Sequence, residues 1–241
     1  MKVLILAAGV GSRLRPITNK IPKCLTDING KAIIERQIDA LLVNGFDEIF
    51  IVVGYKKEKV RNLLNEKYPA INIHLIDNLD YESTNNLYSF YLAKPFLLGH
   101  DFILMNGDVI FDPEILKDLL NSPRENIIPV EKGGFNEESM KIVVENNVVK
   151  DISKKITKNN AFGISIDVYK FSNQTSGKLF QKAKEIIFDQ GQKNLWNEVA
   201  IQSILNEVEF YPLDIESKYW IEIDNHDDLN MAKETIKTKQ V

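Results

Sequence analysis

The 241-residue sequence predicts an α/β fold in which a mostly parallel sheet is covered by helices on both faces. Two observations support this prediction. Strand-like apolar runs alternate with helical patterns along residues 1–112, which is the rhythm of successive β-α-β units. Two of these runs lead into Gly9 and Asp108, as expected for a Rossmann-like, doubly wound sheet that binds its ligand at the carboxyl ends of the strands.

The first half of the chain supplies four strands and three helices. Three of the four apolar runs read as buried strands, and the third run alternates, which suits a strand nearer an edge. Ile34, Ile38 and Leu41 share one face of the first helix, and Gly45 is a natural stop. The predicted strands are residues 2–7, 47–53, 71–76 and 101–105, and the predicted helices are residues 31–44, 57–67 and 85–97.

Beyond residue 112 the pattern changes to an added region of hairpins and helices. A hairpin is predicted around the pair Asn146-Asn147. Asn225 is expected to cap the last helix, with Asp228 in its first turn. No repeat or linker divides the chain. The predicted strands are residues 126–131, 140–156 (the hairpin), 161–171, 209–215 and 219–224, and the predicted helices are residues 113–121, 175–189, 197–207 and 225–237.

Composition excludes several classes of protein. The net charge is −4 and no basic stripe occurs, so nucleic acid is not expected as a partner. The single cysteine, Cys24, excludes an intramolecular disulfide and a multi-cysteine zinc site, and a small buried side chain is favoured over a reactive thiol. The apolar run after Met1 is too short for an export signal, and no run reaches the ~18 apolar residues of a membrane span. We therefore expect a cytoplasmic protein that has no membrane partner.

The loop after the first strand predicts a site for a nucleoside triphosphate. It contains Gly9, Gly11 and Ser12, and two cations follow at Arg13 and Lys23. Small residues let the backbone approach a phosphate closely, and exposed N–H groups together with two cations balance its charge. The small-residue loop of residues 7–12 is therefore the candidate site for the triphosphate.

Two common nucleotide-binding motifs are incomplete here. The fingerprint G-x-G-x-x-G has Leu14 in place of its third glycine, and Gly54 rather than an acidic residue follows the second strand. The Walker A pattern is absent. Two cations beside a phosphate loop favour transfer of a phosphoryl-type group over hydride transfer. A tight β-α turn with incidental surface cations is the alternative.

Four segments then carry a resemblance to a known family. The pattern A-A-G-x-G-S-R-L-x-P followed by T-N-x-x-P-K-x-L resembles the motif of the sugar-phosphate nucleotidyltransferase superfamily. The segment T-N-N-L-Y-S at residues 84–89 is similar to that of the bacterial choline-phosphate cytidylyltransferases. Asn106-Gly107-Asp108 and W-I-E-I-D, which ends at Asp224, resemble the two metal-binding segments of the superfamily.

The resemblance implies one nucleotidyltransferase domain spanning residues 1–241. Residues 1–112 would bind the nucleotide, and residues 113–241 would bind the acceptor and complete the metal site. Mg²⁺ would be held by Asp108 and Asp224, since it prefers one or two carboxylates together with phosphates and water. Their alternative roles are a turn residue for Asp108 and a helix cap for Asp224.

The resemblance also implies roles for the other site residues. Arg13 and Lys23 would be catalytic. The nucleotide would be held by Leu6, Ala7, Ala8, Gly9, Gly11, Ser12, Asn85 and Asn86. The amides of Asn85 and Asn86 can read a pyrimidine edge, but capping of a helix is an almost equal alternative.

Four residues are candidates for binding the acceptor. Lys141 and Lys154, on the predicted hairpin, would face the acceptor phosphate, and a solvated hairpin face is their alternative. Trp196 and Glu198 combine an aromatic ring with a carboxylate, which suits an amine or a quaternary ammonium group. Ordinary core packing of Trp196 remains equally open.

The implied reaction is transfer of CMP from CTP to a small phosphorylated acceptor, with release of pyrophosphate. Within the family the chain most resembles the enzymes that act on L-glutamine phosphate, which give CDP-L-glutamine for modification of a capsule polysaccharide at the cell surface. Phosphocholine, 2-aminoethylphosphonate and a sugar 1-phosphate remain alternative acceptors. A module that senses CTP without catalysis is the alternative from another class. A homodimer is compatible with the resemblance, but the sequence itself sets no oligomeric state.

Overall fold

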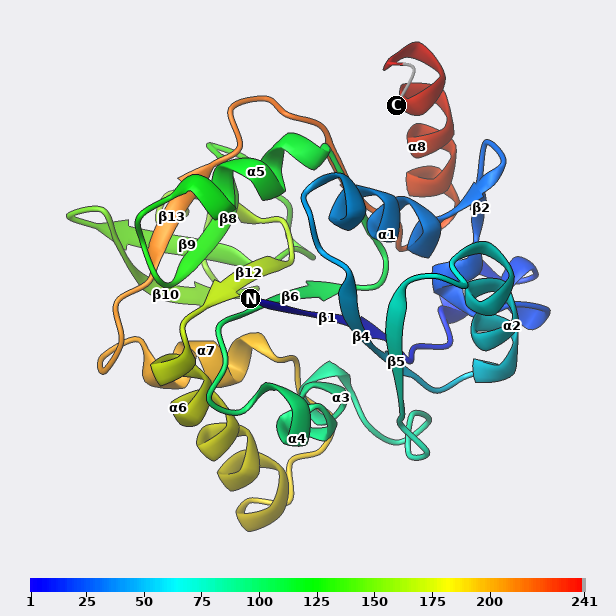
Figure 1. Ribbon diagram of the computed structural model, residues 1–241. Helices are drawn as coiled ribbons and strands as arrows, with labels where there is room; N and C mark the ends of the chain where they lie inside the picture. The colour runs from blue at the N-terminus through cyan, green and yellow to red at the C-terminus, as the bar shows by residue number, and fades with distance from the viewer. Residues whose placement is uncertain (240–241) are drawn as a thin grey trace.

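Four parallel strands form one half of the sheet: β1 (Lys2–Ala7), β4 (Glu48–Val53), β5 (Asn72–Asp77) and β6 (Phe102–Asn106). In the computed structural model, which describes residues 1–239, β1 lies between β6 and β4, and β5 lies outermost (Figure 1). Strands β1, β4 and β6 are buried apolar runs, as strands covered on both faces require. The expected α/β fold is confirmed.

The second half of the chain extends this sheet beyond β6, mainly with antiparallel strands. These are β12 (Val168–Phe171), β8 (Ile127–Lys132), β11 (Gly163–Ser165), β9 (Lys141–Glu145) and β10 (Val148–Ser153), while β13 (Tyr211–Asp214) pairs in parallel with β8. The order is β10-β9-β11-β8-β12-β6-β1-β4-β5. Strands β9 and β10 form the predicted hairpin, whose turn residues Asn146 and Asn147 have φ angles of 51° and 62°.

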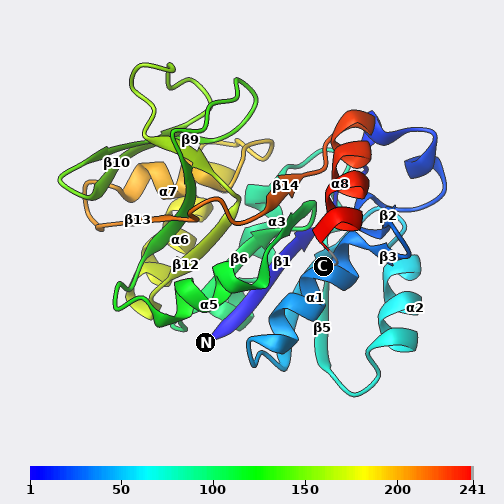
Figure 2. The same cartoon turned by 90° about the horizontal axis from the view of Figure 1, so that it is seen from above.

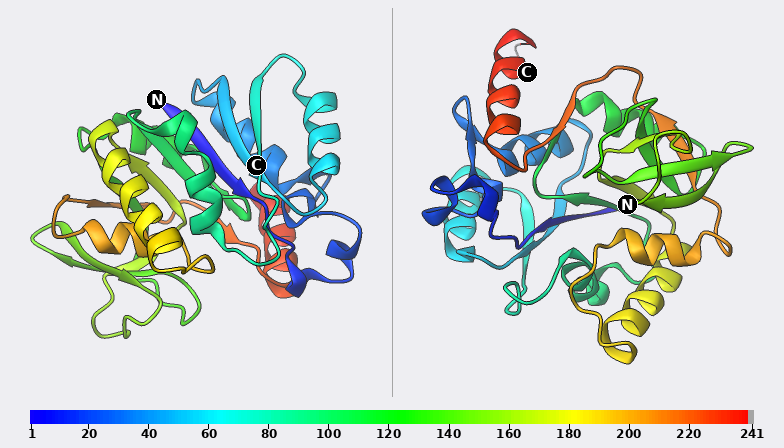
Figure 3. Two further views of the ribbon diagram at one scale, coloured as in Figure 1. Left: turned by 90° about the horizontal axis from the view of Figure 1, so that it is seen from below. Right: turned by 180° about the vertical axis from the view of Figure 1, so that it is seen from behind.

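Alternate side chains of β1 point to opposite faces of the sheet, and helices cover each face. Val3 and Ile5 share a core with α1 (Ile33–Val43), α2 (Lys57–Lys67) and α5 (Pro113–Asn121). Leu4 and Leu6 share another core, on the face seen in Figure 3 to carry α3 (Asn86–Leu92), α4 (Lys94–Leu97), α6 (Asn173–Lys184) with its π-helical extension η4 (Glu185–Asp189), and α7 (Glu198–Ile204). No helix within residues 1–239 is both long and apolar enough to cross a membrane.

A third, smaller core joins the C-terminal helix to the rest of the molecule. In it, α8 (His226–Lys239) packs against a two-stranded antiparallel sheet of β7 (Val109–Phe111) and β14 (Trp220–Glu222). The helix also lies beside the hairpin of β2 (Asp27–Ile28) and β3 (Lys31–Ala32), as Figure 2 shows. There the Asn29 amide donates to the Lys233 carbonyl at 2.8 Å. This core ties the N-terminal segment to the C-terminal segment.

The structure differs from the predicted elements at four places. The helix expected over residues 85–97 divides into α3 and α4, because Pro95 lacks the N–H that would continue it. The strand expected over residues 161–171 breaks at Asp167, whose φ of 59° is left-handed. Strand β7 and the β2–β3 hairpin were not expected, because each is only two or three residues long.

Candidate active site

A cavity of about 360 Å³ opens where β1 and β6 end. The two strands pair Leu6 with Asn106, and the Gly107 N–H donates to the Leu6 carbonyl at 2.8 Å. A Cβ atom on Gly107 would lie 2.7 Å from that carbonyl oxygen, so glycine is needed for this close approach. The nucleotide loop and Asp108 therefore face one cavity, as the fold predicted.

Nearly all of the residues predicted for the site line this cavity. They are Leu6, Ala7, Ala8, Gly9, Gly11, Ser12, Arg13, Lys23, Asn85, Asn86, Asp108, Lys154, Trp196, Glu198 and Asp224. Lys141 is the exception. Its ammonium group is buried and donates to the carbonyls of Asn136 and Glu137 at 2.9 and 3.0 Å, and burial lowers its pKa. Lys141 therefore binds the backbone of the loop at residues 136–137 and does not line the cavity, so the expected contact with the acceptor is not supported.

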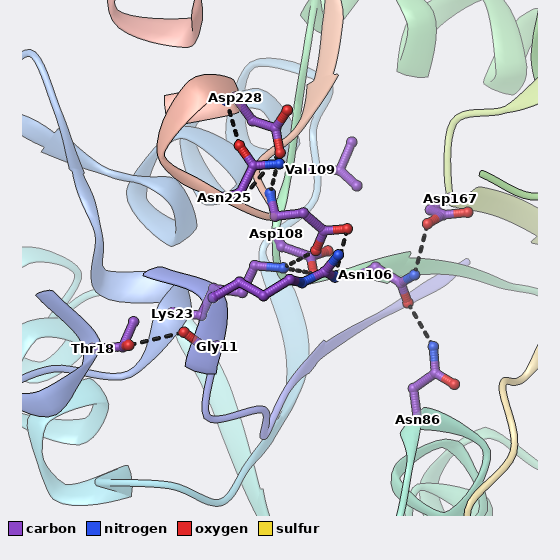
Figure 4. Close-up of polar contacts among 12 residues, drawn as sticks. Gly11, Thr18, Lys23, Asn86, Asn106, Asp108, Val109, Asp167, Asn225 and Asp228 are labelled. Atoms are coloured by element: carbon purple, nitrogen blue, oxygen red, sulfur yellow. Dashed lines mark hydrogen bonds and ion pairs between the residues drawn. The ribbon is translucent and has the colours of Figure 1, made fainter. Parts of the chain in front are cut away.

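The nucleotide loop, by which we mean the segment from Ala8 to Leu25 that follows β1, contains three short 3₁₀ helices. These are η1 (Ser12–Leu14), η2 (Ile17–Asn19) and η3 (Lys23–Leu25). Gly11 has a φ of 67°, and a Cβ atom there would lie 2.7 Å from the Cβ of Lys23. The Thr18 hydroxyl donates to the Gly11 carbonyl at 2.8 Å (Figure 4). These contacts hold Lys23 against the loop.

The Lys23 ammonium group bridges the two predicted metal-binding carboxylates. It donates to Asp108 Oδ2 at 2.6 Å and to Asp224 Oδ1 at 2.7 Å, as Figure 4 shows for Asp108. The Arg13 guanidinium lies 2.8 Å from the second oxygen of Asp224. Two cations and two carboxylates from distant parts of the chain therefore converge beside the nucleotide loop.

The short ladder of β7 and β14 explains why Asp108 and Asp224 meet. It pairs Val109 with Glu222, and the Ile223 N–H donates to the Asp108 carbonyl at 2.9 Å. One carboxylate oxygen from each of Asp108, Glu222 and Asp224 lies within 4.8 Å of the others. Glu222 was not among the predicted residues, although the alternation Glu222-Ile223-Asp224 has the period of a strand that buries isoleucine and leaves both acids on one side.

The start of α8 holds Asp224 in place. The Asn225 side chain accepts from the N–H groups of Asp227 and Asp228 at 2.8 and 3.1 Å, which confirms it as the cap of α8. In return, Asp228 Oδ2 accepts from the N–H of Asp224 at 2.9 Å and of Asn225 at 3.0 Å. Asn225 thus takes the capping role, and the Asp224 carboxylate is left to face the cavity.

Two carboxyl groups of this cluster, Asp224 and Glu222, differ in acidity. Burial alone would lower the pKa of Lys23, but the charges of Asp108 and Asp224 outweigh burial and hold that pKa above its ordinary value. Burial raises the pKa of Asp224, yet Lys23 and Arg13 bring it below its ordinary value. Burial and neighbouring carboxylates raise the pKa of Glu222 to about 9. Glu222 therefore holds its proton much more tightly than Asp224 does.

The two asparagines of the nucleotide half play different parts. Asn85 caps α3, since its Oδ1 accepts from the Asn86 N–H at 2.8 Å. Asn86 Oδ1 accepts from the Asn197 N–H at 2.9 Å, and its Nδ2 lies 3.4 Å from Asn106 Oδ1. The Asn106 amide in turn donates to Asp167 at 3.0 Å (Figure 4). Both ends of the Asn86 amide are therefore engaged within the protein.

A buried group on the acceptor side, which we call the acidic relay, consists of Asp167, Tyr169 and Glu198. The Tyr169 hydroxyl lies 2.8 Å from Glu198 Oε1 and 3.1 Å from Asp167 Oδ1. Burial, followed by the charge of Glu198, raises the pKa of Asp167 to about 8, and burial also raises the pKa of Glu198. Asp167 was not predicted, because its place at the end of a broken strand gives no pattern.

The remaining predictions concern Lys154 with Trp196, and the single cysteine. The Lys154 ammonium lies 4.8 Å from the centre of the Trp196 ring, and that ring is 42% exposed, so it is not part of the core. Cys24 is buried, and burial raises the pKa of its thiol to about 12. This agrees with a small buried side chain rather than a reactive thiol.

With this geometry in place, comparison with known proteins decides the family. A model of the MobA-like NTP transferase domain matches residues 3–198. The chain belongs to this family. It is therefore an enzyme of the nucleotidyltransferase class, and the resemblance read from its motifs is confirmed.

Individual relatives of this NTP transferase are cytidylyltransferases and a related synthase. The CTP:phosphoglutamine cytidylyltransferase of Campylobacter jejuni is 29% identical over 97% of this chain and 100% of that protein. A solved structure of CTP:phosphocholine cytidylyltransferase from Streptococcus pneumoniae superposes with a TM-score of 0.82 and 28% identity, covering 98% of each chain. A CMP-5'-(3-aminopropyl)phosphonate synthase of Streptomyces rubellomurinus is 38% identical over 53% of this chain, which spans only 20% of that longer protein.

The family match stops short of the complete carboxylate cluster. It ends at residue 198, whereas Glu222 and Asp224 lie in the segment that follows. In this NTP transferase, two of the three clustered carboxylates are thus supplied from outside the matched region.

Proposed function

We propose that this NTP transferase is a Mg²⁺-dependent cytidylyltransferase that moves CMP from CTP to a small phosphorylated acceptor. The observation that carries this proposal is the convergence of Arg13 and Lys23 with Asp108 and Asp224 beside the nucleotide loop. Nucleotidyl transfer needs mainly positioning and electrostatic stabilisation, and these groups supply both. The names of the cytidylyltransferase relatives support CTP as the nucleotide.

The carboxylate cluster fits a Mg²⁺ ion. Asp108 Oδ1 is buried and has no hydrogen-bond partner within the described residues, so it retains its full capacity as a ligand. The other Asp108 oxygen and Asp224 Oδ1 already face a cation, the Lys23 ammonium. Carboxylate oxygens are the ligands that Mg²⁺ prefers. Asp108 and Asp224 would hold the ion with Glu222 beside them, and the bound ion would neutralise charge on the triphosphate and the leaving pyrophosphate.

The residues of the nucleotide half would bind and orient CTP. Backbone N–H groups of residues 6–12 would cradle the triphosphate, as small residues at the end of a strand allow. Arg13 and Lys23 would donate to its oxygens and stabilise the negative charge that grows at the α-phosphate. The Asn85 amide nitrogen would donate to the pyrimidine, whereas Asn86 would fix the position of Asn106.

The chemical step would be an in-line displacement at the α-phosphorus. An oxygen of the acceptor phosphate forms the new P–O bond, and the bond from the α-phosphorus to the oxygen bridging to the β-phosphate breaks. Pyrophosphate leaves with that electron pair. Because the acceptor phosphate is already an anion, the step requires no general base.

L-Glutamine phosphate is our first candidate for the acceptor, and it would give CDP-L-glutamine. The full-length similarity to the phosphoglutamine enzyme supports it. Lys154 would contact the acceptor phosphate, while Trp196 and Glu198 would contact the rest of the molecule. Phosphocholine, 2-aminoethylphosphonate and a sugar 1-phosphate are the alternatives. We further propose a cytoplasmic enzyme, which can form a homodimer, that serves the modification of a capsule polysaccharide at the cell surface.

A pyrophosphate-release assay tests this function. The enzyme is incubated with Mg²⁺ and each of the four common NTPs against L-glutamine phosphate, phosphocholine, 2-aminoethylphosphonate and glucose 1-phosphate. We expect release with CTP that depends on the acceptor. Saturable CTP binding without release for any acceptor would favour the CTP-sensing alternative, and a preference for another NTP would contradict the assignment of cytosine.

A further inference from the structure

We propose that the acceptor carries an ammonium group with at least one N–H, and that Glu198 accepts a hydrogen bond from it. This inference rests on the proposed function and narrows the class of acceptor. It separates phosphorylated amines and amino acids, which have such an N–H, from phosphocholine, whose nitrogen has none.

The first observation is an unpartnered oxygen. Glu198 is 2% exposed and lines the cavity, and its Oε1 accepts from the Tyr169 hydroxyl at 2.8 Å. Its Oε2 is buried and has no hydrogen-bond partner within residues 1–239. A buried carboxylate oxygen without a donor is costly, so a ligand that brings an N–H into this end of the cavity is stabilised there.

The second observation is the direction of the hydrogen bonds in the acidic relay. The Tyr169 hydroxyl has one hydrogen, so it can donate to only one of the two carboxyl groups that it touches. The shorter of the two contacts, 2.8 Å to Glu198 against 3.1 Å to Asp167, marks Glu198 as the charged acceptor, because hydrogen bonds to a charged oxygen are shorter. Asp167 then carries a proton and donates it to Tyr169, while Tyr169 donates to Glu198. The negative charge of the relay is thereby placed on Glu198, next to the cavity.

The third observation is the balance of charge around the cavity. Among the residues that the structure describes, six carboxyl groups line it against three basic groups, which are Arg13, Lys23 and Lys154. Arg13 and Lys23 pair with the Asp108–Asp224 cluster, so Lys154 is the basic group left for the acceptor end. With protons on Asp167 and Glu222, four carboxylates still face these three cations, so a cationic group on the acceptor suits the cavity and Lys154 suits the acceptor phosphate.

The aromatic lining does not suit a quaternary ammonium group. Such groups are recognised by cages of several aromatic faces. Within residues 1–239 the cavity is lined by two aromatic residues, Tyr81 and Trp196, and the Trp196 ring already lies 4.8 Å from the Lys154 ammonium. A single N–H bonded to Glu198 is therefore the better match for this end of the cavity.

A series of acceptors that differ only in N-methylation tests the inference. Pyrophosphate release from CTP is measured with phosphoethanolamine, its N-methyl and N,N-dimethyl derivatives, and phosphocholine, all of which stay cationic at pH 7. A hydrogen bond to a charged group is worth about 1.5–3 kcal/mol, so loss of the last N–H should lower kcat/KM by roughly 10- to 150-fold. We expect this drop between the dimethyl and trimethyl compounds.

The variant Glu198→Gln provides the matched test. It keeps an oxygen for the Tyr169 hydroxyl but presents an NH₂ donor to the cavity. The kcat/KM for the dimethyl compound should then exceed that for phosphocholine by no more than about threefold, and the change from wild type should lie mainly in KM. Glu207→Gln, a change in an exposed ion pair with Lys178, should keep the wild-type ratio. A thermal melt of each variant checks folding, and if E198Q does not fold, the series on the wild-type enzyme decides alone.

Three outcomes are distinguishable. Phosphocholine used as well as the dimethyl compound, or a ratio unchanged in folded E198Q, overturns the inference while leaving the cytidylyltransferase function intact. Turnover of CTP with glucose 1-phosphate but with no amine also overturns it. No release from CTP with any acceptor contradicts the proposed function, and the inference fails with it.

Discussion

The ammonium nitrogen of Lys23 lies 2.6 Å from a carboxylate oxygen of Asp108. The same nitrogen lies 2.7 Å from Asp224, so one cation compensates two carboxylates that come from distant parts of the chain. Lys23 should therefore contribute both to the stability of the folded protein and to the proposed reaction. These two contributions can be measured separately.

Replacing Lys23 by methionine should abolish most of the activity and destabilise the protein. The proposed role of Lys23 at the α-phosphate predicts a loss of at least 10²-fold in kcat, as for other groups that stabilise charge in a transition state. Removing one partner of a largely buried ion pair should also cost about 3 kcal/mol, since Asp108 and Asp224 are left to repel each other. Pyrophosphate release and urea unfolding in EDTA measure the two effects.

Added Mg²⁺ should then stabilise Lys23→Met more than it stabilises the wild-type protein, because the ion can compensate the carboxylates that the lysine has left. Lys31→Met is the matched control: Lys31 also pairs with an aspartate, Asp39, but its side chain is 53% exposed, so little change is expected. Near-normal turnover of folded Lys23→Met would show that Lys23 is not needed for catalysis.

Replacing Asp108 by asparagine should weaken the use of Mg²⁺ without unfolding the protein. Loss of one charged ligand is expected to raise the Mg²⁺ concentration for half-maximal activity by at least 10-fold and to lower Mn²⁺ binding seen by electron paramagnetic resonance. Asp112→Asn is the control, because Asp112 caps α5 at a position where asparagine serves equally well. Undiminished Mn²⁺ binding by Asp108→Asn would contradict the assignment of the metal site.

Replacing Asn85 by serine separates its capping role from base recognition. Serine keeps an oxygen for the Asn86 N–H, so the stability should change little, but it removes the amide nitrogen and should raise the KM for CTP about 10-fold. Asn85→Ala should lose about 1 kcal/mol of stability as well, because the cap is also lost. An unchanged KM in both variants would leave Asn85 as a helix cap alone.

Replacing Asp167 by asparagine should flatten the dependence of stability on pH. Burial raises the pKa of Asp167 from 3.8 to about 8. Between these values the folded protein keeps a proton that the unfolded chain has released, so the free energy of unfolding falls as pH rises. Asparagine mimics the protonated acid: its oxygen can accept from Asn106, and its NH₂ can donate to Tyr169.

The wild-type protein should therefore lose on the order of 3 kcal/mol between pH 5.5 and pH 8.5 that Asp167→Asn retains. Urea unfolding at the two pH values measures this difference. Asp118→Asn, which alters a surface ion pair with Lys218, should follow the wild-type curve. Parallel curves for wild type and Asp167→Asn would show that Asp167 does not carry the raised pKa.

The sequence predicted well those features that depend on local patterns. The buried runs of β1, β4 and β6 and the apolar face of α1 follow directly from their sequence patterns, and the small residues from Gly9 to Ser12 predicted a loop after β1. The position of Asn225 as a cap was also local, because its partners are two and three residues away.

What the sequence could not predict depends on pairing between distant segments. The ladder of β7 and β14 is one such pairing: a strand over residues 219–224 was predicted, but β7 is too short to show a period, so the partner of β14 was not. The position of Glu222 beside Asp108 depends on that ladder. The contacts of Asp167 with Tyr169 and Glu198 likewise join residues whose sequence spacing carries no pattern. Lys141 was predicted to contact the acceptor, and that prediction was wrong. A lysine on a hairpin is ordinarily solvated, so the sequence did not indicate that this one is buried.

The β7–β14 ladder also makes the acidic cluster depend on tertiary pairing. Glu222 belongs to β14 and Asp224 follows it, so these two carboxylates reach Asp108 only when β14 has paired with β7. A substitution that disturbs this small ladder would therefore separate the clustered carboxylates even where the main sheet and the nucleotide loop stay folded.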